Sequence, residues 1–137
     1  MRMWLFITGQ ARMGLNPTNN TAVLAGQAMS FYYISGGVKG GSYFIDASGS
    51  QGDIEIEFPG TEKPAAGMYN IEPLGGNWLY GAVRVRLVAN SSNWPASSGK
   101  LYVSVKNNKV TTTFCGVPVF NQTFSFAATA TARITEE

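Results

Sequence analysis

The chain has 137 residues, of which 45% are hydrophobic, and this is the size and apolar content of one globular domain rather than of a disordered chain. Only 13% of the residues are charged, and the net charge of +2 is spread without a block of either sign, which excludes the clustered basic surface that nucleic-acid partners require. No apolar run approaches the roughly 20 residues of a membrane-spanning helix, so we expect no membrane-spanning segment.

The chain begins with MRMWLFITG, in which four apolar residues follow a charged start. This run is shorter than the apolar core of about 7–15 residues in a secretory signal, so no signal peptide is visible. We expect residues 3–8 to form a short strand that is either buried on both faces or packed by a neighbour at a sheet edge.

The next segments alternate polar and apolar residues with the period of two that is typical of strands. We expect strands at residues 28–35 and 41–47, joined by the glycine-rich GGVKGG, and a further strand at 67–72. Two segments give the clearest alternation: DIEIEF at 53–58 and AVRVRLV at 82–88. If these two were neighbours, the acidic row of the first would face the basic row of the second and form cross-strand ion pairs.

Residues 99–120, GKLYVSVKNNKVTTTFCGVPVF, predict a β-hairpin with a two-residue Asn107–Asn108 turn of type I′. The register pairs Val105 with Val110, Val103 with Thr112 and Leu101 with Phe114. The predicted core residues are those on one face: Leu101, Val103, Val105, Val110 and Phe114. Cys115 is placed on the opposite face.

Residues 123–134 predict a long strand with one buried face. The expected inward residues are Phe124, Phe126, Ala128, Ala130, Ala132 and Ile134.

With eight to nine strands and no helical pattern, we expect a single all-β domain over residues 1–137, folded as an antiparallel β-sandwich. Long loops such as ANSSNWPASSG at 89–99 fit the ends of a sandwich. A closed, calycin-like β-barrel is the alternative.

The candidate chemistry is limited because the chain contains no histidine and one cysteine. Without histidine, Ser-His-Asp and Cys-His nucleophile systems are excluded, and we expect no catalytic residues, no metal site and no cofactor. Cys115 is interpreted as a strand residue rather than a reactive thiol. Glu55 and Glu57 have the spacing of a carboxylate pair that could hydrolyse glycosides, but their alternating segment favours a solvated strand face.

Four aromatic residues are the candidate ligand-binding residues: Trp78, Tyr80, Trp94 and Tyr69. They lie in or beside loops rich in Asn, Ser and Gly, where exposed rings with nearby amides could stack on sugars or anchor a protein. The competing interpretation is that the tryptophans fill the ends of the core.

At AAGMYNI and SSGKLYVSVKNNKVTTTFCGVPVF the sequence resembles a group of uncharacterised exported all-β domains of Bacteroidetes, many of them lipoproteins. The matching positions are Gly67 to Tyr69, Ser98 to Val105 and Lys109 to Cys115. The resemblance implies an all-β fold and a periplasmic, cell-surface or extracellular location, and it supplies no catalytic residues. The signal peptide and lipid-bearing cysteine that usually begin those proteins are not visible here.

The function expected from the sequence is a non-enzymatic exported module that acts in binding or assembly, with a protein or glycan partner or with itself. One alternative is a small-ligand or glycan-binding domain that uses the loop aromatics. Another is a subunit of an extracellular assembly in which strand edges pair between copies.

Overall fold

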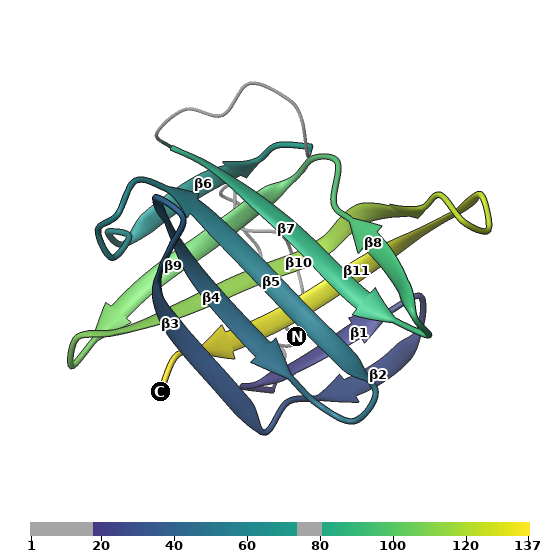
Figure 1. Ribbon diagram of the computed structural model, residues 1–137, viewed down its shortest axis with the longest axis horizontal. Helices are drawn as coiled ribbons and strands as arrows, with labels where there is room; N and C mark the ends of the chain where they lie inside the picture. The colour runs from purple at the N-terminus through teal and green to yellow at the C-terminus, as the bar shows by residue number, and fades with distance from the viewer. Residues whose placement is uncertain (1–17, 74–80) are drawn as a thin grey trace, which may run out of the picture.

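The computed structural model describes residues 18–73 and 81–137, and within these ranges the protein is built from strands without any helix (Figure 1). It therefore has no helix there that could cross a membrane. The strands are β1 (Thr21–Leu24), β2 (Gln27–Ser30), β3 (Tyr33–Lys39), β4 (Ser42–Ser48), β5 (Gly52–Pro59), β6 (Gly67–Ile71), β7 (Ala82–Ala89), β8 (Ser92–Pro95), β9 (Lys100–Lys106), β10 (Lys109–Asn121) and β11 (Phe126–Thr135). The strand expected at residues 3–8 lies outside the described residues.

The strands form one curled sheet in the order β2-β1-β11-β10-β9-β6-β7-β5-β4-β3, and β8 pairs with β7 off this path. In Figure 1, β3, β4, β5 and β7 cross in front of β9, β10 and β11, so the sheet bends back over itself as a half-barrel. All neighbours are antiparallel except β6 and β7, which pair in parallel through Asn70 with Ala82 and Ile71 with Val83. The all-β prediction is confirmed.

The predicted strand number and the purely antiparallel pairing are both wrong. Eleven strands are described rather than eight to nine. The excess arises because the segment expected at 28–35 is divided between β2 and β3, and because β1 and β8 are four-residue strands in segments rich in Asn, Ser and Thr. Strands this short are too brief to show alternation, and residues 89–99, which we expected to be a loop, contain β8.

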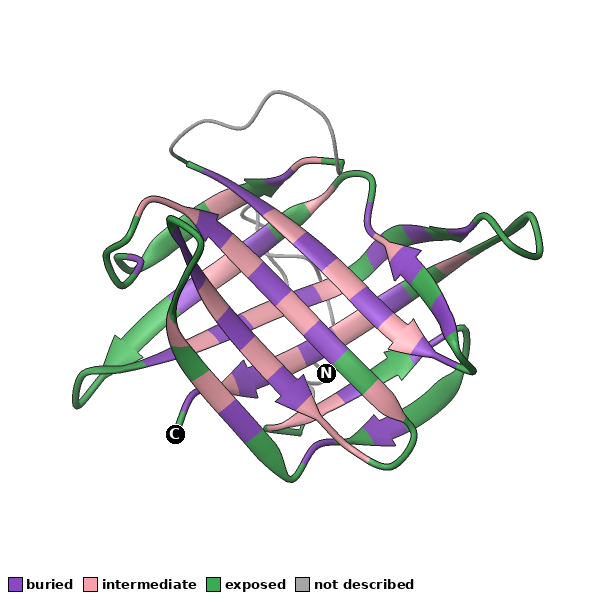
Figure 2. Ribbon diagram, viewed as in Figure 1, coloured by how far each residue is buried: buried purple, intermediate pink, exposed green. Residues whose placement is uncertain are grey.

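The core lies on the concave side of the sheet, where alternate residues of each strand point inward. On β5 and β7 every predicted inward residue is at most 2% exposed: Ile54, Ile56, Phe58, Val83, Val85 and Leu87. Figure 2 shows this alternation as buried and half-buried bands along both strands. The predicted inward faces of these two segments are confirmed.

The predicted cross-strand charge pairing between β5 and β7 is also confirmed. Glu55 stands opposite Arg86, and Glu57 stands opposite Arg84. The Arg86 guanidinium donates to Glu55 Oε1 at 2.9 Å, and about a third of each side chain is exposed. The two charged rows therefore lie on the convex side of the sheet at β5 and β7.

The β9–β10 hairpin has the predicted register, with Val105 opposite Val110 and Val103 opposite Thr112. Asn107 and Asn108 have φ angles of 52° and 62°, the two positive angles that a type I′ turn needs. Leu101, Val103, Val110 and Phe114 are buried, but Val105 is 41% exposed, so its predicted place in the core is wrong. Its cross-strand partner Val110 is fully buried, so the edge of the core runs between the two strands of the hairpin near its turn.

The long final strand is buried only over its second half. Ala130, Ala132 and Ile134 are at most 1% exposed, whereas Phe124 and Phe126 are 66% and 51% exposed and were wrongly predicted to face the core. Phe124 lies in the β10–β11 turn, because β11 begins only at Phe126. This hairpin projects beyond the body of the sheet, as Figure 1 shows. The strand pattern therefore continues further than the layer that could cover it.

Candidate functional site

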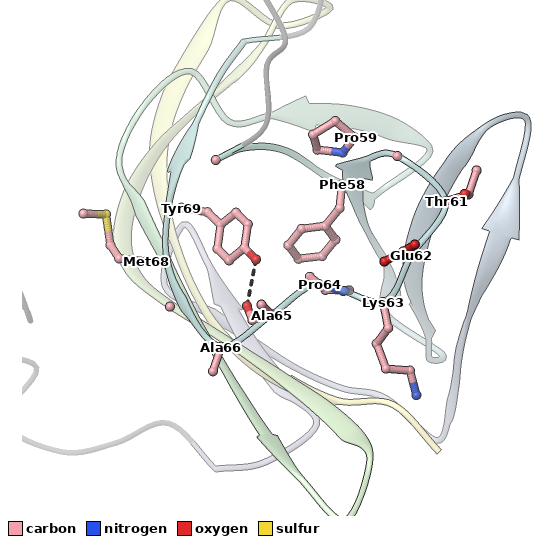
Figure 3. A pocket seen from close by; sticks show the side chains of 13 residues that line it. Phe58, Pro59, Thr61, Glu62, Lys63, Pro64, Ala65, Ala66, Met68 and Tyr69 are labelled. Atoms are coloured by element: carbon pink, nitrogen blue, oxygen red, sulfur yellow. Dashed lines mark hydrogen bonds between the residues drawn. The ribbon is translucent and has the colours of Figure 1, made fainter.

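The loop at residues 60–66, between β5 and β6, folds over one end of the curled sheet and lines a half-open cavity of about 610 Å³ (Figure 3). We call it the Tyr69 cavity. Its lining residues are Phe58, Pro59, Gly60, Thr61, Glu62, Lys63, Pro64, Ala65, Ala66, Gly67, Met68, Tyr69 and Gly81.

Two aromatic rings form the wall of the Tyr69 cavity. Phe58 ends the inward face of β5, and Tyr69 lies in β6. Their ring centroids are 5.3 Å apart and the ring planes are at 83°, an edge-to-face arrangement that aromatic pairs favour. The cavity therefore offers a fixed apolar surface to an entering group.

The hydroxyl of Tyr69 fixes the loop rather than facing solvent. It donates a hydrogen bond to the carbonyl oxygen of Ala65 at 2.7 Å, as Figure 3 shows. Burial raises the pKa of Tyr69 and outweighs the opposite effect of the Ala65 carbonyl, so the phenol stays protonated at neutral pH and keeps this bond. Pro59 and Pro64 further restrict the loop because each has a fixed φ angle.

A buried carboxylate holds the same loop from its other side. Glu136 follows β11, is 4% exposed and accepts three bonds. Lys63 Nζ lies 2.9 Å from Oε2, the Val110 backbone N–H donates to Oε2 at 2.9 Å, and the Tyr43 hydroxyl donates to Oε1 at 2.7 Å. Lys63 also donates to the carbonyl oxygen of Asn108 at 2.7 Å. We call Tyr43, Lys63, Val110 and Glu136 the Glu136 cluster.

The Glu136 cluster joins segments that are far apart in the sequence. Its members come from β4, the cavity loop, β10 and the end of the chain, so it connects the front of the half-barrel to the back. Gly36 of β3 makes room for it, because a Cβ atom at this position would overlap Glu136 Oε1 and the Tyr43 hydroxyl. The loop over the cavity is therefore held by the ion pair between Lys63 and Glu136, and the absence of a side chain at Gly36 leaves space for that carboxylate.

The ionisation of this cluster is set by competing effects. Burial alone raises the pKa of Glu136, but the hydrogen bonds from Lys63, Tyr43 and the Val110 N–H, with the charge of Lys63, outweigh it and lower the pKa. Burial, and then the bond to the Glu136 carboxylate, raise the pKa of Tyr43. At neutral pH the cluster thus contains a carboxylate, an ammonium group and a neutral phenol.

The structure separates the aromatic residues that the sequence grouped together. Tyr69 lines the cavity described above, whereas Trp94 of β8 is 7% exposed and lies at the opposite end of β7. Trp78 and Tyr80 lie outside the described residues. Tyr69 and Trp94 therefore belong to different regions of the fold.

Cys115 lies on the face opposite Phe114, as predicted, and is half-buried. Burial raises the pKa of its thiol and outweighs the hydrogen bond from Thr131, so the thiol remains protonated at neutral pH. Of the two carboxylates considered for chemistry, Glu55 is engaged by Arg86 and Glu57 stands opposite Arg84.

Sequence reasoning missed the Glu136 cluster. Prolines and glycines mark the cavity loop in the sequence, but nothing in ITEE distinguishes a buried glutamate from a solvated one. Within residues 18–73 and 81–137, no group of three or more potential ligands from His, Cys, Asp and Glu is placed to hold a metal ion. No protein-family model, curated protein or solved structure matches the chain.

Proposed function

We propose that this protein is a non-catalytic binding module that takes a small apolar or aromatic group in the Tyr69 cavity. The observation that supports this most directly is the cavity itself, whose aromatic wall is held by the Tyr69–Ala65 hydrogen bond and whose loop is anchored at Glu136. Its volume of about 610 Å³ is typical of small-molecule sites.

The ligand chemistry follows from the lining. Phe58, Tyr69, Pro59 and Pro64 provide an apolar surface, and an aromatic or prolyl group would lie edge-on or flat against the two rings. Lys63 lines the cavity but is bound to Glu136 and Asn108, so it supplies little attraction for an anion. A neutral apolar group is therefore the better match.

The non-catalytic part of the proposal is supported by the residues that a reaction would need. The sequence contains no histidine. The thiol of Cys115 is held in its protonated form, and Glu55 is engaged in an ion pair on the outer face, away from the cavity.

The experiment is a titration of the ¹⁵N-labelled protein with indole, followed by amide chemical shifts. We expect the largest shifts at Thr61, Ala65 and Tyr69, and we expect Tyr69→Ala to abolish them. Tyr69→Phe keeps the ring and removes the bond to Ala65, so it should bind indole more weakly than the native protein. Tyr32→Ala is the matched control, because Tyr32 is 74% exposed and does not line the cavity. Shifts that are absent, or unchanged in Tyr69→Ala, would contradict the proposal.

A second candidate function is self-assembly through a strand edge. Strand β3 ends the sheet, and among the described residues its backbone pairs only with β4. Tyr33 and Val38 on this strand are 61% and 52% exposed, which adds apolar surface to an open edge. Size-exclusion chromatography with light scattering tests it: a monomer at every concentration rejects it, and Val38→Lys should dissociate any oligomer.

The location and the finer description of the sheet belong to the same proposal. Export to the periplasm, cell surface or exterior is supported by the resemblance to exported Bacteroidetes domains and by the low charged fraction. An incomplete barrel describes the sheet better than a sandwich, because one path of neighbouring strands connects β2 to β3. Immunodetection in fractionated source cells tests the location.

A further inference from the structure

A second cavity lies at the opposite end of the half-barrel from Tyr69, and its volume is about 810 Å³. It is open to solvent on one side and is lined by the β1–β2, β4–β5 and β7–β8 turns together with Trp94, and we call it the Trp94 cavity. Its lining residues are Leu24, Ala25, Gln27, Ala28, Met29, Gly49, Ser50, Gln51, Gly52, Asp53, Val88, Ala89, Asn90, Ser91 and Trp94.

The inner surface of the Trp94 cavity is apolar. Leu24, Met29, Ala89 and Trp94 are each at most 7% exposed. The indole ring is held by an edge-to-face contact with Phe126, whose centroid is 6.0 Å away. The indole Nε1–H is buried and has no acceptor among the described residues, which is unusual because buried donors are almost always paired.

The outer rim of the cavity is polar. Gln27, Gln51, Asp53, Asn90 and Ser91 contribute amide, carboxylate and hydroxyl groups. Gln51 Oε1 accepts a long bond of 3.5 Å from the Ser30 N–H. No side chain of Gln27, Asp53 or Asn90 is hydrogen-bonded to another described residue, so these donors and acceptors are available to a ligand.

The backbone around the rim is closely fitted. A Cβ atom at Gly49 would overlap the Ser30 carbonyl, and one at Gly52 would overlap the Val88 carbonyl, so the β4–β5 turn is packed directly against its two neighbours. Asn90 and Ser91 have φ angles of 55° and 60°, which place the β7–β8 turn in the left-handed region. The polar side chains therefore start from fixed backbone positions.

We propose that the Trp94 cavity binds a neutral saccharide. Amide and carboxylate groups in pairs suit vicinal hydroxyls, and an apolar inner surface suits the C–H face of a sugar ring. Among the described lining residues Asp53 is the only charged one and is anionic, which disfavours phosphate and other anions, and one carboxylate does not make a cation site. The unpaired indole N–H belongs to a residue that lines this cavity, and a ligand oxygen is the acceptor that we propose for it.

The test uses ¹⁵N-labelled protein and four named probes: maltose, cellobiose, xylobiose and N,N′-diacetylchitobiose. At millimolar concentration we expect at least one of them to shift the Trp94 indole N–H resonance and the amides of Gly52 and Asn90. If none of the four shifts these resonances, the proposal is rejected.

Variants locate the binding. Asp53→Ala and Gln51→Ala should each weaken the affinity about tenfold, the effect of losing one good hydrogen bond. Trp94→Phe keeps an aromatic ring and removes the indole donor, so it should weaken binding several-fold without loss of folding. Asn93→Ala is the matched control, since Asn93 is next to Trp94, is exposed and does not line the cavity. Binding that Asp53→Ala and Gln51→Ala leave unchanged overturns the assignment.

The saccharide site is independent of the proposed apolar site. Indole binding at the Tyr69 cavity should be unaffected by Asp53→Ala, and sugar binding should be unaffected by Tyr69→Ala. Either proposal can therefore fail while the other stands.

Discussion

The two ends of the curled sheet are closed in different ways. At the Tyr69 end, side chains fix the structure: Glu136 accepts bonds from Tyr43, Lys63 and the Val110 N–H, and Tyr69 donates to Ala65. At the Trp94 end, close backbone packing at Gly49 and Gly52 fixes the turns, and most rim side chains remain unpaired within the described residues. Loss of a side-chain partner should therefore damage the first end more than the second, and added bulk at the β4–β5 turn should damage the second.

The largest effect is expected from Glu136→Ala. This change leaves the Lys63 ammonium, the Tyr43 hydroxyl and the Val110 N–H without their shared acceptor, and we expect it to lower the free energy of unfolding by about 3 kcal/mol. Asp53→Ala, at the other end, should change it by less than about 0.5 kcal/mol. Urea unfolding measures both, and equal losses would remove the contrast between the ends.

The second prediction concerns the Trp94 end, where added side-chain bulk should be destabilising. Gly52→Ala adds a Cβ atom against the Val88 carbonyl and should cost about 2 kcal/mol of unfolding free energy. Gly37→Ala is the control, because nothing lies within 4 Å of a Cβ atom built there. Thermal or urea unfolding measures the difference; a harmless Gly52→Ala would show that the β4–β5 turn has room to move.

The third prediction concerns pH and should have a smaller effect than Glu136→Ala. The pKa of Glu136 is lowered in the folded protein, so its stabilisation is fully present above the ordinary glutamate pKa of about 4.3 and is lost as pH falls through the lower folded value. The native protein should therefore exceed Glu136→Gln in urea midpoint at pH 7, and the gap should narrow at pH 3. A gap that stays constant would mean that the charge of Glu136 does not contribute.

A smaller effect than those at Glu136 and Gly52 is expected midway between the two ends. Glu55→Gln breaks the ion pair with Arg86 on the convex face, where about a third of each side chain is exposed, and should cost about 0.5 kcal/mol. A double-mutant cycle with Arg86→Gln isolates the pairwise term. A coupling as large as that of Glu136 with Lys63 would show that burial is not what distinguishes the Tyr69 end.

Much of the sheet was predictable because alternation reports burial directly wherever a strand crosses the core. The inward residues of β5 and β7, the hairpin register and the neighbouring charged rows all follow from this rule. The rule failed at Val105, whose partner Val110 is buried, and at Phe124 and Phe126, which lie at the projecting β10–β11 turn. The alternating pattern indicates how far a strand extends, whereas the burial of its residues depends on how far the layer that faces them extends.

The candidate sites were less predictable. Tyr69 was identified, and its loop was marked by proline and glycine, but the bond to Ala65 depends on how that loop folds. Trp94 was expected beside a loop, whereas β8 places it against β7 within a segment of small polar residues. Glu136 gave no signal because its partners are 26 to 93 residues away in the sequence.

The fit between Gly36 and Glu136 has a consequence for how this sequence can change over time. Because a Cβ atom at position 36 would occupy the space of the Glu136 carboxylate, a larger residue there requires that this carboxylate moves away from its donors or that position 136 becomes smaller. The two positions should therefore vary together, and we expect homologues without glycine at 36 to lack glutamate at 136 more often than those with it.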